Sequence, residues 1–189
     1  MVETGVIHGR FQVLHNDHMK YLMAGKSCCQ NLVVGITNPD PTLTRDDKTA
    51  QGRSNPSANP MSYYERYIII KTTLLEYGFG IQEFSVVPLP INLPDLYKYY
   101  VPLDATFFLT IYDEWGEKKL SMFESMNLKT KILWRRPLSK KGLSGTRIRQ
   151  YIASGQPWEH LVPHTSARIM KQMGIVERIK RLMYRLSDK

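Results

Sequence analysis

The sequence predicts an α/β domain with a doubly wound parallel sheet and a helical extension towards the C-terminal end. Its 189 residues suit one compact domain, 1–189, with a buried core. Short β-branched runs alternate with helical patterns, an order that produces right-handed crossovers and parallel strands. The last segment, 164–189, has a basic helical pattern without a further strand.

The chain opens with a strand, a turn and a helix. Residues 5–10 are the first predicted strand. Asn16 or Asp17 then caps a helix whose apolar positions extend to Cys28. Residues 32–36 form a second β-branched run, short enough for a strand covered on both faces.

The next helix has the clearest start signal. Ser62 is followed by Glu65 at capping-box spacing, and the helix is expected to end near Gly78. Residues 81–87 predict a third strand. A segment rich in proline and tyrosine follows at 88–102.

The second half repeats the alternation of strand and helix. Residues 105–111 are the clearest central strand, 114–126 read as helix, and 131–134 predict a fifth strand.

Three helical segments are expected after that strand. Ser144 is placed to cap a helix running to Ser154. Residues 166–186 are helical, with an interruption predicted at Gly174.

Residues 37–62 change to polar, Pro-rich composition without periodicity, which is long for a connection in a compact domain. We predict a mobile flap here. Its Arg45, Lys48 and Arg53 could close over a triphosphate, although solvated loop charges are the commoner explanation.

The charge balance favours anionic partners. Twenty-six lysines and arginines against seventeen aspartates and glutamates give a formal net charge of +9. This excess does not separate nucleotide from nucleic acid. The basic tail keeps an RNA-binding hypothesis open, but a solvated helix face is the commoner explanation, and nucleic acid is not the expected partner.

No apolar run approaches the roughly 20 residues needed to span a bilayer, so we expect no membrane contact. The first residues lack a secretory signal pattern. The adjacent Cys28 and Cys29 are read as free thiols, which indicates a cytoplasmic protein.

The turn after the first strand is the usual phosphate site of such sheets. Here Gly9, Arg10 and Phe11 precede His15 and His18, which lie three residues apart where a helix begins. Both imidazoles then face one side of the first helical turn, near backbone N–H groups that favour anions. A zinc site is the alternative, but Cys28 and Cys29 are too far along the helix to share its ion. We therefore predict no metal-ligating residue.

A second cluster opens the late helix. Ser144, Gly145 and Thr146 offer hydroxyl and N–H groups at a helix start, and Arg149 can add a bidentate contact to a phosphate. An ordinary helix cap is the alternative explanation for this cluster taken alone.

Together the two clusters resemble a known family. Residues 9–18, GRFQVLHNDH, are similar to the GRFQP-x-H-x-G-H signature of the nucleotidyltransferase superfamily, and residues 143–149 resemble its late I-S-x-T-x-I-R motif. Residues 158–163 and 176–180 add a W-x-x-L-x-P segment and a V-E-R-I-K helix. These resemble archaeal-type nicotinamide-mononucleotide (NMN) adenylyltransferases.

The resemblance implies a Rossmann-like nucleotidyltransferase fold and a reaction. An adenylyl group would pass from ATP, the co-substrate, to a mononucleotide phosphate, with Mg²⁺ assisting and pyrophosphate released. The expected partners are therefore ATP and a mononucleotide acceptor, and many members of the family form homo-oligomers, so we expect assembly.

The resemblance also implies roles for individual residues. His15, His18 and Arg149 would be catalytic, stabilising or orienting the triphosphate. The nucleotide-binding positions would be Gly9, Arg10, Phe11, Ser144, Gly145 and Thr146.

The chain departs from the family pattern at three places. Val13 replaces a proline, and Asp17 replaces the glycine of H-x-G-H, where it serves at least as a partner for the helix dipole. The third is residues 110–116, which replace an expected S-G-N stretch.

Substrate contacts are predicted within this third segment, from Tyr112, Asp113 and Trp115 at the carboxyl end of the best strand. Packing of Trp115 under its own helix is an equal alternative. Loop packing is the preferred explanation for Tyr97, Tyr99 and Tyr100.

The leading hypothesis is an adenylyltransferase acting on nicotinamide or nicotinate mononucleotide in NAD biosynthesis. The alternatives are a nucleotidyltransferase with another acceptor, either pantetheine phosphate or an acceptor used with CTP, and a non-catalytic nucleotide- or RNA-binding protein.

Overall fold

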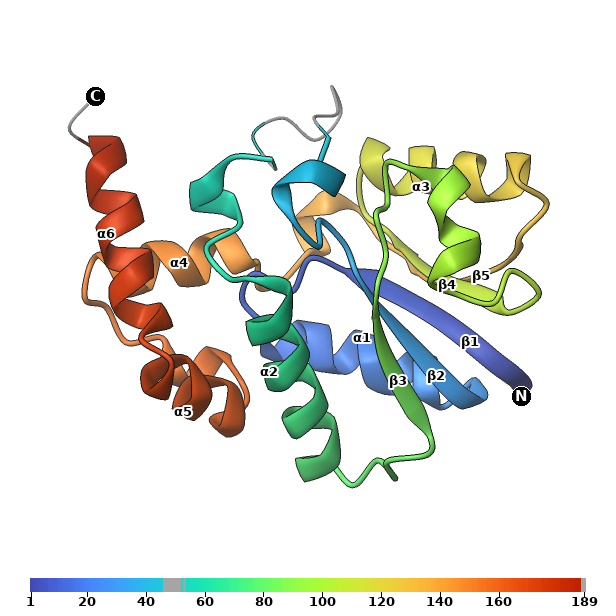
Figure 1. Ribbon diagram of the computed structural model, residues 1–189, viewed down its shortest axis with the longest axis horizontal. Coiled ribbons are helices and arrows are strands. Elements are labelled where there is room, and N and C mark those ends of the chain that lie inside the picture. Colours follow the sequence, from blue (N-terminus) through green and yellow to red (C-terminus); the bar gives the residue numbers. More distant parts are fainter. Residues whose placement is uncertain (46–51, 53, 188–189) are drawn as a thin grey trace.

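The computed structural model describes residues 1–45, 52 and 54–187, and it contains a five-stranded parallel sheet in the order β3-β2-β1-β4-β5 (Figure 1). The strands are β1 (Val2–Gly9), β2 (Cys29–Ile36), β3 (Phe84–Pro88), β4 (Thr106–Ile111) and β5 (Lys129–Arg135). The helices are α1 (Asn16–Lys26), α2 (Tyr63–Glu76), α3 (Glu114–Ser125), α4 (Gly145–Ala153), α5 (His164–Gln172) and α6 (Ile175–Ser187). The predicted doubly wound parallel sheet is confirmed.

The strand order places a switch point beside the first strand. β1 pairs with β2 on one side and with β4 on the other, both in parallel. The chain therefore winds outwards through β2 and β3, returns, and winds the other way through β4 and β5. Ligands of open α/β sheets bind at the carboxyl ends of strands at such a point.

Strand alternation divides the core between the two faces of the sheet. Ile7 packs in a cluster with residues of α1 and α2, whereas its neighbour Val6 packs in a second cluster with Phe123 of α3. Because successive side chains of a strand point to opposite faces, both faces of β1 are covered by apolar side chains.

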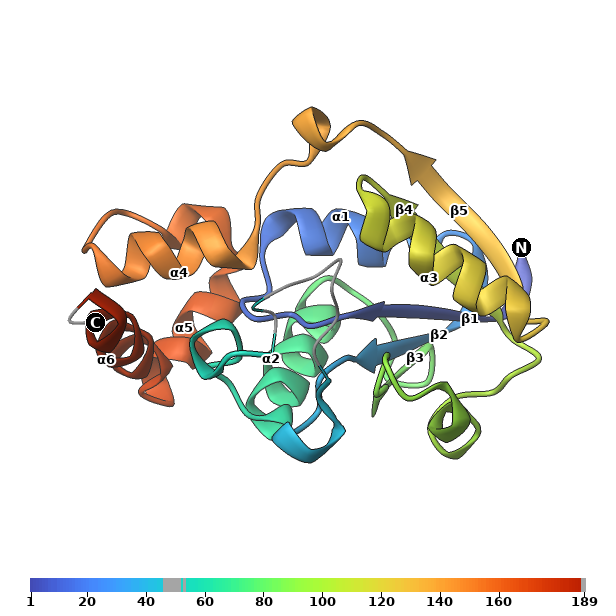
Figure 2. The ribbon, with the colours of Figure 1, turned by 90° about the horizontal axis from the view of Figure 1, so that it is seen from above.

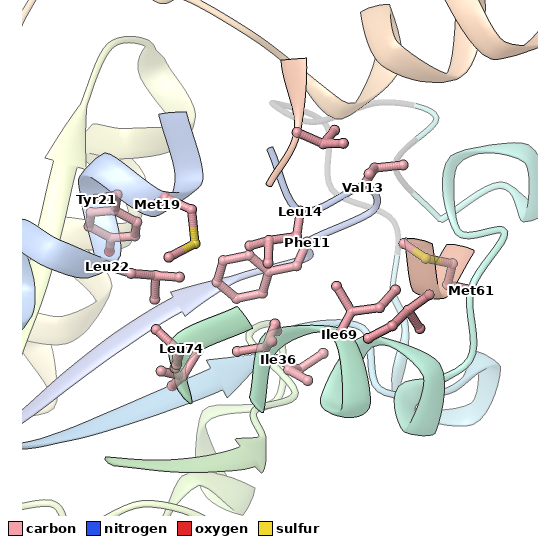
Figure 3. Packing of buried hydrophobic residues seen from close by; sticks show 14 of the residues in the cluster. Phe11, Val13, Leu14, Met19, Tyr21, Leu22, Ile36, Met61, Ile69 and Leu74 are labelled. Carbon is pink, nitrogen blue, oxygen red and sulfur yellow. The ribbon is translucent and has the colours of Figure 1, made fainter. Parts of the chain in front are cut away.

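The first cluster continues past the end of the sheet. Figure 3 shows Phe11 and Leu14, from the turn after β1, packed between Leu22 of α1 and Ile69 of α2, and Val13 of the same turn belongs to this cluster. These turn residues are almost fully buried. The turn that carries the first motif is therefore anchored by the core itself.

Two expectations at the first helix are wrong. The N-cap of α1 is His15, not Asn16 or Asp17, because the His15 ring accepts the hydrogen bond from the backbone N–H of His18. Cys28 lies after the helix, which ends at Lys26, and Cys29 already begins β2. Both thiols are free.

Other boundaries follow local chemistry closely. Ser62 and Glu65 form the predicted capping box at the start of α2. The third strand begins at Phe84 rather than Ile81, because the N–H of Glu83 donates to Gly80 in a turn. In the Pro- and Tyr-rich segment Tyr97 is fully buried and donates its hydroxyl to Ile91, as expected for loop packing.

The C-terminal helices gather at one end of the molecule, beyond the sheet (Figure 2). The predicted interruption is confirmed: Gly174, with φ of 67°, separates α5 from α6. Arg178 of α6 donates to the Glu65 carboxylate at 2.7 Å and to the Pro60 carbonyl at 3.1 Å. Part of the basic character of the tail thus holds α6 against the start of α2. Among the described residues, no helix is both long and apolar enough to cross a bilayer.

A buried arginine joins α2 to the ligand edge of the sheet. Arg66 is 1% exposed, and its guanidinium donates to the carbonyls of Arg10 (3.0 Å), Thr37 (2.8 Å) and Asn38 (2.8 Å). These carbonyls follow β1 and β2. Burial lowers the pKa of Arg66 to about 10, which leaves it charged at neutral pH.

We expect Arg66→Met to lower the free energy of unfolding by about 3 kcal/mol or more, because three loop carbonyls lose their donors in a dry environment. Urea titration of the purified variant measures this loss. Arg168→Met on the exposed side of α5 is the matched control, expected to change stability by less than about 0.5 kcal/mol. Equal stability of the two variants would contradict the structural role of Arg66.

Candidate functional site

A cavity of about 640 Å³ opens at the switch point, where the loops after β1 and β4 meet the start of α4. All the side chains and glycines that the sequence singled out for the site line it. They are Gly9, Arg10, Phe11, His15, His18, Tyr112, Asp113, Trp115, Ser144, Gly145, Thr146 and Arg149. Two motifs more than 120 positions apart in the sequence therefore share one wall.

The turn after β1 holds its shape through Phe11 and Gln12. Phe11 has a left-handed backbone, with φ of 50°, and its buried ring lies edge-on to the His18 ring at 5.0 Å. The Gln12 amide pairs with the backbone of Met61 through two hydrogen bonds of 2.8 and 2.9 Å. The start of α2 therefore supports the turn from behind.

The two histidines cap the helix reciprocally. The His18 N–H donates to Nδ1 of His15 at 3.2 Å, and the His15 N–H donates to Nδ1 of His18 at 3.4 Å. The rings stack at 3.6 Å. A backbone N–H can only donate, so Nδ1 of each ring must accept, and the proton of each neutral ring is on Nε2.

Burial keeps both rings neutral. It lowers the pKa of His15 to about 4, against a smaller raising effect of Asp17. Burial also holds the pKa of His18 well below its usual value, helped by the neighbouring His15 and Arg10, although the Val13 backbone raises it. At neutral pH the pair therefore presents two Nε2–H donors and no net charge.

The start of α4 lies directly against the β1–α1 turn. A Cβ at Gly145 would collide with the backbone of Gln12 and Val13, so only glycine fits there. The Arg149 guanidinium donates to the Gln12 carbonyl and, at 3.2 Å, to the Thr146 hydroxyl. Ser144 caps the helix by accepting from the N–H of Arg147, so the helix-cap explanation holds as well. Free N–H groups of the first turn and a 4%-exposed arginine thus face one cavity.

Asp17, the departure from the motif glycine, bridges the two halves of this wall. Its carboxylate accepts the Leu143 N–H at 2.6 Å and binds Lys20 at 2.6 Å. Partial burial raises its pKa, but the bonds from Lys20 and Leu143 outweigh that effect and lower the pKa overall. Asp17 stays ionised and fastens the loop before α4 to α1.

The residues after β4 have several structural partners. Asp113 caps α3 by accepting the Gly116 N–H at 3.1 Å and binds Lys141 at 2.8 Å. The Tyr112 hydroxyl accepts from the Trp134 indole at 2.6 Å. Trp115 is half-buried against the second core cluster and also lines the cavity. Trp115 therefore packs against the core, as one prediction expected, and also borders the cavity, as the substrate-contact prediction requires.

Several cavity residues escape motif reasoning, above all His8 and Lys119, whose side chains meet at 3.4 Å. Strand alternation for His8 and helical spacing for Lys119 could have indicated that these two residues lie near the site. His8 alternates with Ile7 on β1 and so faces α3, and Lys119 lies one helical turn after Trp115. Arg45 of the predicted flap also lines the cavity, whereas Lys48 and Arg53 lie outside the described residues.

The described lining is strongly positive. It contains five cationic side chains against the two carboxylates of Asp17 and Asp113. Each carboxylate already binds a lysine. The cavity therefore has the potential to attract and hold a polyanion.

No family model matches the chain. The chain is 49% identical to a phosphonoformate cytidylyltransferase of Streptomyces viridochromogenes, over 94% of its own length and 95% of that protein. It is 30% identical to a nicotinamide-nucleotide adenylyltransferase of Thermococcus kodakarensis, over 100% of its own length and 93% of that protein.

A solved structure supports the fold. A bifunctional NMN adenylyltransferase/ADP-ribose pyrophosphatase of Francisella tularensis, crystallised with AMP and manganese, superposes with a TM-score of 0.64 at 13% identity. The alignment covers 96% of this chain and 52% of that one, so the present chain spans about half of the larger protein. With near-complete alignment to relatives at 30% and 49% identity, this chain belongs to the nucleotidyltransferase superfamily and is an enzyme of that type.

Proposed function

We propose that the chain is a cytidylyltransferase that transfers CMP from CTP to a small carboxylated phosphonate such as phosphonoformate and releases pyrophosphate. The observation that carries nucleotidyl transfer is the convergence of His15, His18 and Arg149 on one positively charged cavity. The choice of CTP and phosphonate rests on the relative at 49% identity, which is much more similar than the adenylyltransferases at 30%.

The reaction is a displacement at the α-phosphorus. An oxygen of the acceptor forms the new bond to phosphorus, the bond to the bridging oxygen of the β-phosphate breaks, and pyrophosphate leaves with both electrons of that bond. Negative charge grows on the transferring and leaving oxygens. Preorganised donors aimed at such oxygens are the main source of acceleration in group transfer.

The chain supplies these donors without a covalent intermediate. In this proposal the Nε2–H groups of His15 and His18 donate to the phosphates at the turn after β1. Gly9, Arg10, Phe11, Ser144, Gly145 and Thr146 form the surrounding cradle, and Arg149 orients the triphosphate from the side of α4. Since the capping bonds fix both rings in advance, little reorganisation is needed during the reaction.

Magnesium fits this site only as a nucleotide complex. Asp17 and Asp113, the carboxylates among the described lining residues, are both bound to lysines. Mg²⁺ commonly keeps most of its ligands from phosphates and water. We therefore propose that it arrives bound to the CTP phosphates and offsets their charge there.

The second candidate is an adenylyltransferase for nicotinamide or nicotinate mononucleotide. The relatives at 30% identity and the exposed part of the Trp115 ring in the cavity favour it, because an indole can stack on a pyridine ring.

A pyrophosphate-release screen separates these functions. We expect release with CTP and phosphonoformate, and much slower release with ATP and either mononucleotide. The nucleotide product is identified by mass spectrometry. Rapid turnover of ATP with a mononucleotide, and none with CTP, would replace the first proposal by the second. No release with any pair, together with tight nucleotide or RNA binding, would favour a non-catalytic protein.

The role of the histidine pair is tested by His18→Asn. The asparagine oxygen can still accept near the Nδ1 position, but no donor remains at the Nε2 position. We expect turnover to fall on the order of 10²-fold, as for loss of one transition-state donor. Unchanged melting temperature shows that the cap survives. His164→Asn, on an exposed histidine at the start of α5, is the control, and equal turnover in both variants would exclude the proposed role.

Arg149→Lys tests the contact from α4. Lysine keeps the charge but cannot donate to the Gln12 carbonyl and a phosphate with one planar fork. We expect weaker CTP binding by roughly 10-fold, the cost of about one charged hydrogen bond. Isothermal titration calorimetry with CTP and Mg²⁺ measures it. An affinity equal to that of the wild type would remove Arg149 from the nucleotide site.

A further inference from the structure

Three aromatic residues, Tyr21, Tyr112 and Trp134, form a connected cluster in the wall of the cavity. Tyr112 directly follows β4, and Trp134 lies on β5, the neighbouring parallel strand. The indole N–H of Trp134 donates to the Tyr112 hydroxyl at 2.6 Å. Sequence reasoning singled out Tyr112 alone, because Trp134 reaches the site only through the pairing of β4 with β5.

The indole of this aromatic cluster is held by its surroundings. The Tyr21 ring lies edge-on to it, with 6.1 Å between the ring centres, and the Arg136 guanidinium lies 5.4 Å from the centre of the indole. Tyr21 is itself anchored, since its buried hydroxyl donates to the Phe108 carbonyl at 2.8 Å. The Tyr112 hydroxyl therefore meets a donor whose position is set by the fold.

The chemistry of this hydrogen bond determines what Tyr112 offers to a ligand. An indole N–H can only donate, whereas a phenol hydroxyl has one proton to donate and two acceptor sites. Trp134 therefore occupies an acceptor site of the Tyr112 oxygen and leaves its proton unused. Within the described part of the chain, the indole is the one hydrogen-bond partner of this hydroxyl. Because Tyr112 lines the cavity, its O–H is a preoriented neutral donor for a ligand there.

The aromatic cluster lies on the same side of the sheet as the proposed phosphate donors. Tyr21 follows His18 by three positions on α1, which is about one helical turn. Trp134 packs against the core cluster of α1 and α2, whereas Trp115 packs against the cluster that contains Phe123 of α3. A nucleotide whose phosphates meet His18 therefore has its nucleoside end within reach of this aromatic cluster.

The properties of this wall suit a nucleobase better than the proposed acceptor. Phosphonoformate is a compact anion without a ring, so aromatic faces and a neutral O–H donor give it little. Cytosine is a flat, uncharged ring whose edge carries two adjacent acceptors, the O2 carbonyl and N3. Aromatic side chains with a polar group at one end bind such rings through contact area and one directed hydrogen bond.

We propose that Tyr112 donates a hydrogen bond to the O2–N3 edge of the cytosine of CTP, and that Trp134 is the positioning residue that orients the hydroxyl for it. This inference rests on the proposed function and deepens it, because it assigns recognition of the base to the ends of β4 and β5. The histidine pair and α4 then hold the triphosphate of the same molecule.

Tyr112→Phe tests the contact, because it removes the hydroxyl and keeps the ring. We expect KM for CTP to rise roughly 3- to 10-fold, as for loss of one neutral hydrogen bond, with KM for phosphonoformate unchanged. Tyr151→Phe is the matched control. The Tyr151 hydroxyl also accepts from a neighbour, Arg147, at 2.8 Å, but Tyr151 is not among the described residues that line the cavity. An unchanged KM for CTP, or an equal rise for both substrates, would overturn the proposal.

The positioning role of Trp134 is tested by Trp134→Phe, alone and combined with Tyr112→Phe. Phenylalanine keeps an aromatic ring beside Tyr21 but has no N–H, so CTP should be weakened selectively here too. The double variant should bind CTP no more weakly than Tyr112→Phe, because the indole acts through the hydroxyl. Losses that simply add in the double variant would show that Trp134 supports only the structure and would overturn its positioning role.

Calorimetric titration with two probes separates the base from the phosphates. Inorganic tripolyphosphate resembles the charged part of CTP but lacks ribose and base. Tyr112→Phe should bind CTP more weakly than the wild type does and should bind tripolyphosphate equally well. Equal weakening of both probes, or of neither, would overturn the base contact.

The same titration distinguishes failure of this inference from failure of the proposed function. Tight binding of ATP to the wild type without binding of CTP would reject CTP as the nucleotide and with it the cytosine contact. If CTP binds and is turned over with phosphonoformate, but Tyr112→Phe leaves its affinity unchanged, the proposed function stands and the role of Tyr112 is rejected.

Discussion

The reciprocal cap between His15 and His18 is the constraint on which the site depends. The backbone N–H of each histidine donates a hydrogen bond to Nδ1 of the other ring. If either imidazole rotated or changed tautomer, one backbone N–H would lose its acceptor. A helix start needs side-chain acceptors, and here the residues that supply them also carry the donors proposed for the phosphates. The same hydrogen bonds therefore start the helix and hold the proposed donors in place.

The second motif, at the start of α4, is held directly against the β1–α1 turn. Gly145 lets α4 approach the backbone of Gln12, and Arg149 donates a hydrogen bond to the Gln12 carbonyl. Asp17 accepts a hydrogen bond from the Leu143 N–H and so holds the loop before α4. Arg66 supports the turn from the opposite side through the Arg10 carbonyl. These contacts join segments from three parts of the chain into one rigid edge. A triphosphate would thus meet groups whose positions are set by the fold.

The sequence predicted what local patterns control. The alternation of strands and helices, the Ser62 capping box and the break at Gly174 all depend on neighbouring residues, and all three agree with the structure. The motifs also predicted which residues line the cavity, although their roles remain proposals. What could not be predicted depends on distant partners. Arg66 looks like a surface arginine until the carbonyls after β1 and β2 surround it, and the bridge from Asp17 to Leu143 spans 126 positions.

In the proposed function, nucleotide binding and acceptor choice use separate elements of the fold. The proposed phosphate cradle comes from the β1–α1 turn and α4, whereas the residues proposed for substrate contact follow β4 and begin α3, on the opposite face of the sheet from α1. Under this proposal a change on α3 would alter the preferred acceptor without moving the histidines. Such a separation is consistent with the similarity of this chain both to a phosphonoformate cytidylyltransferase and to nicotinamide-nucleotide adenylyltransferases. In this proposal the acceptor is selected by the charge and shape of the cavity wall at α3, because the histidine motif is assigned only to the triphosphate.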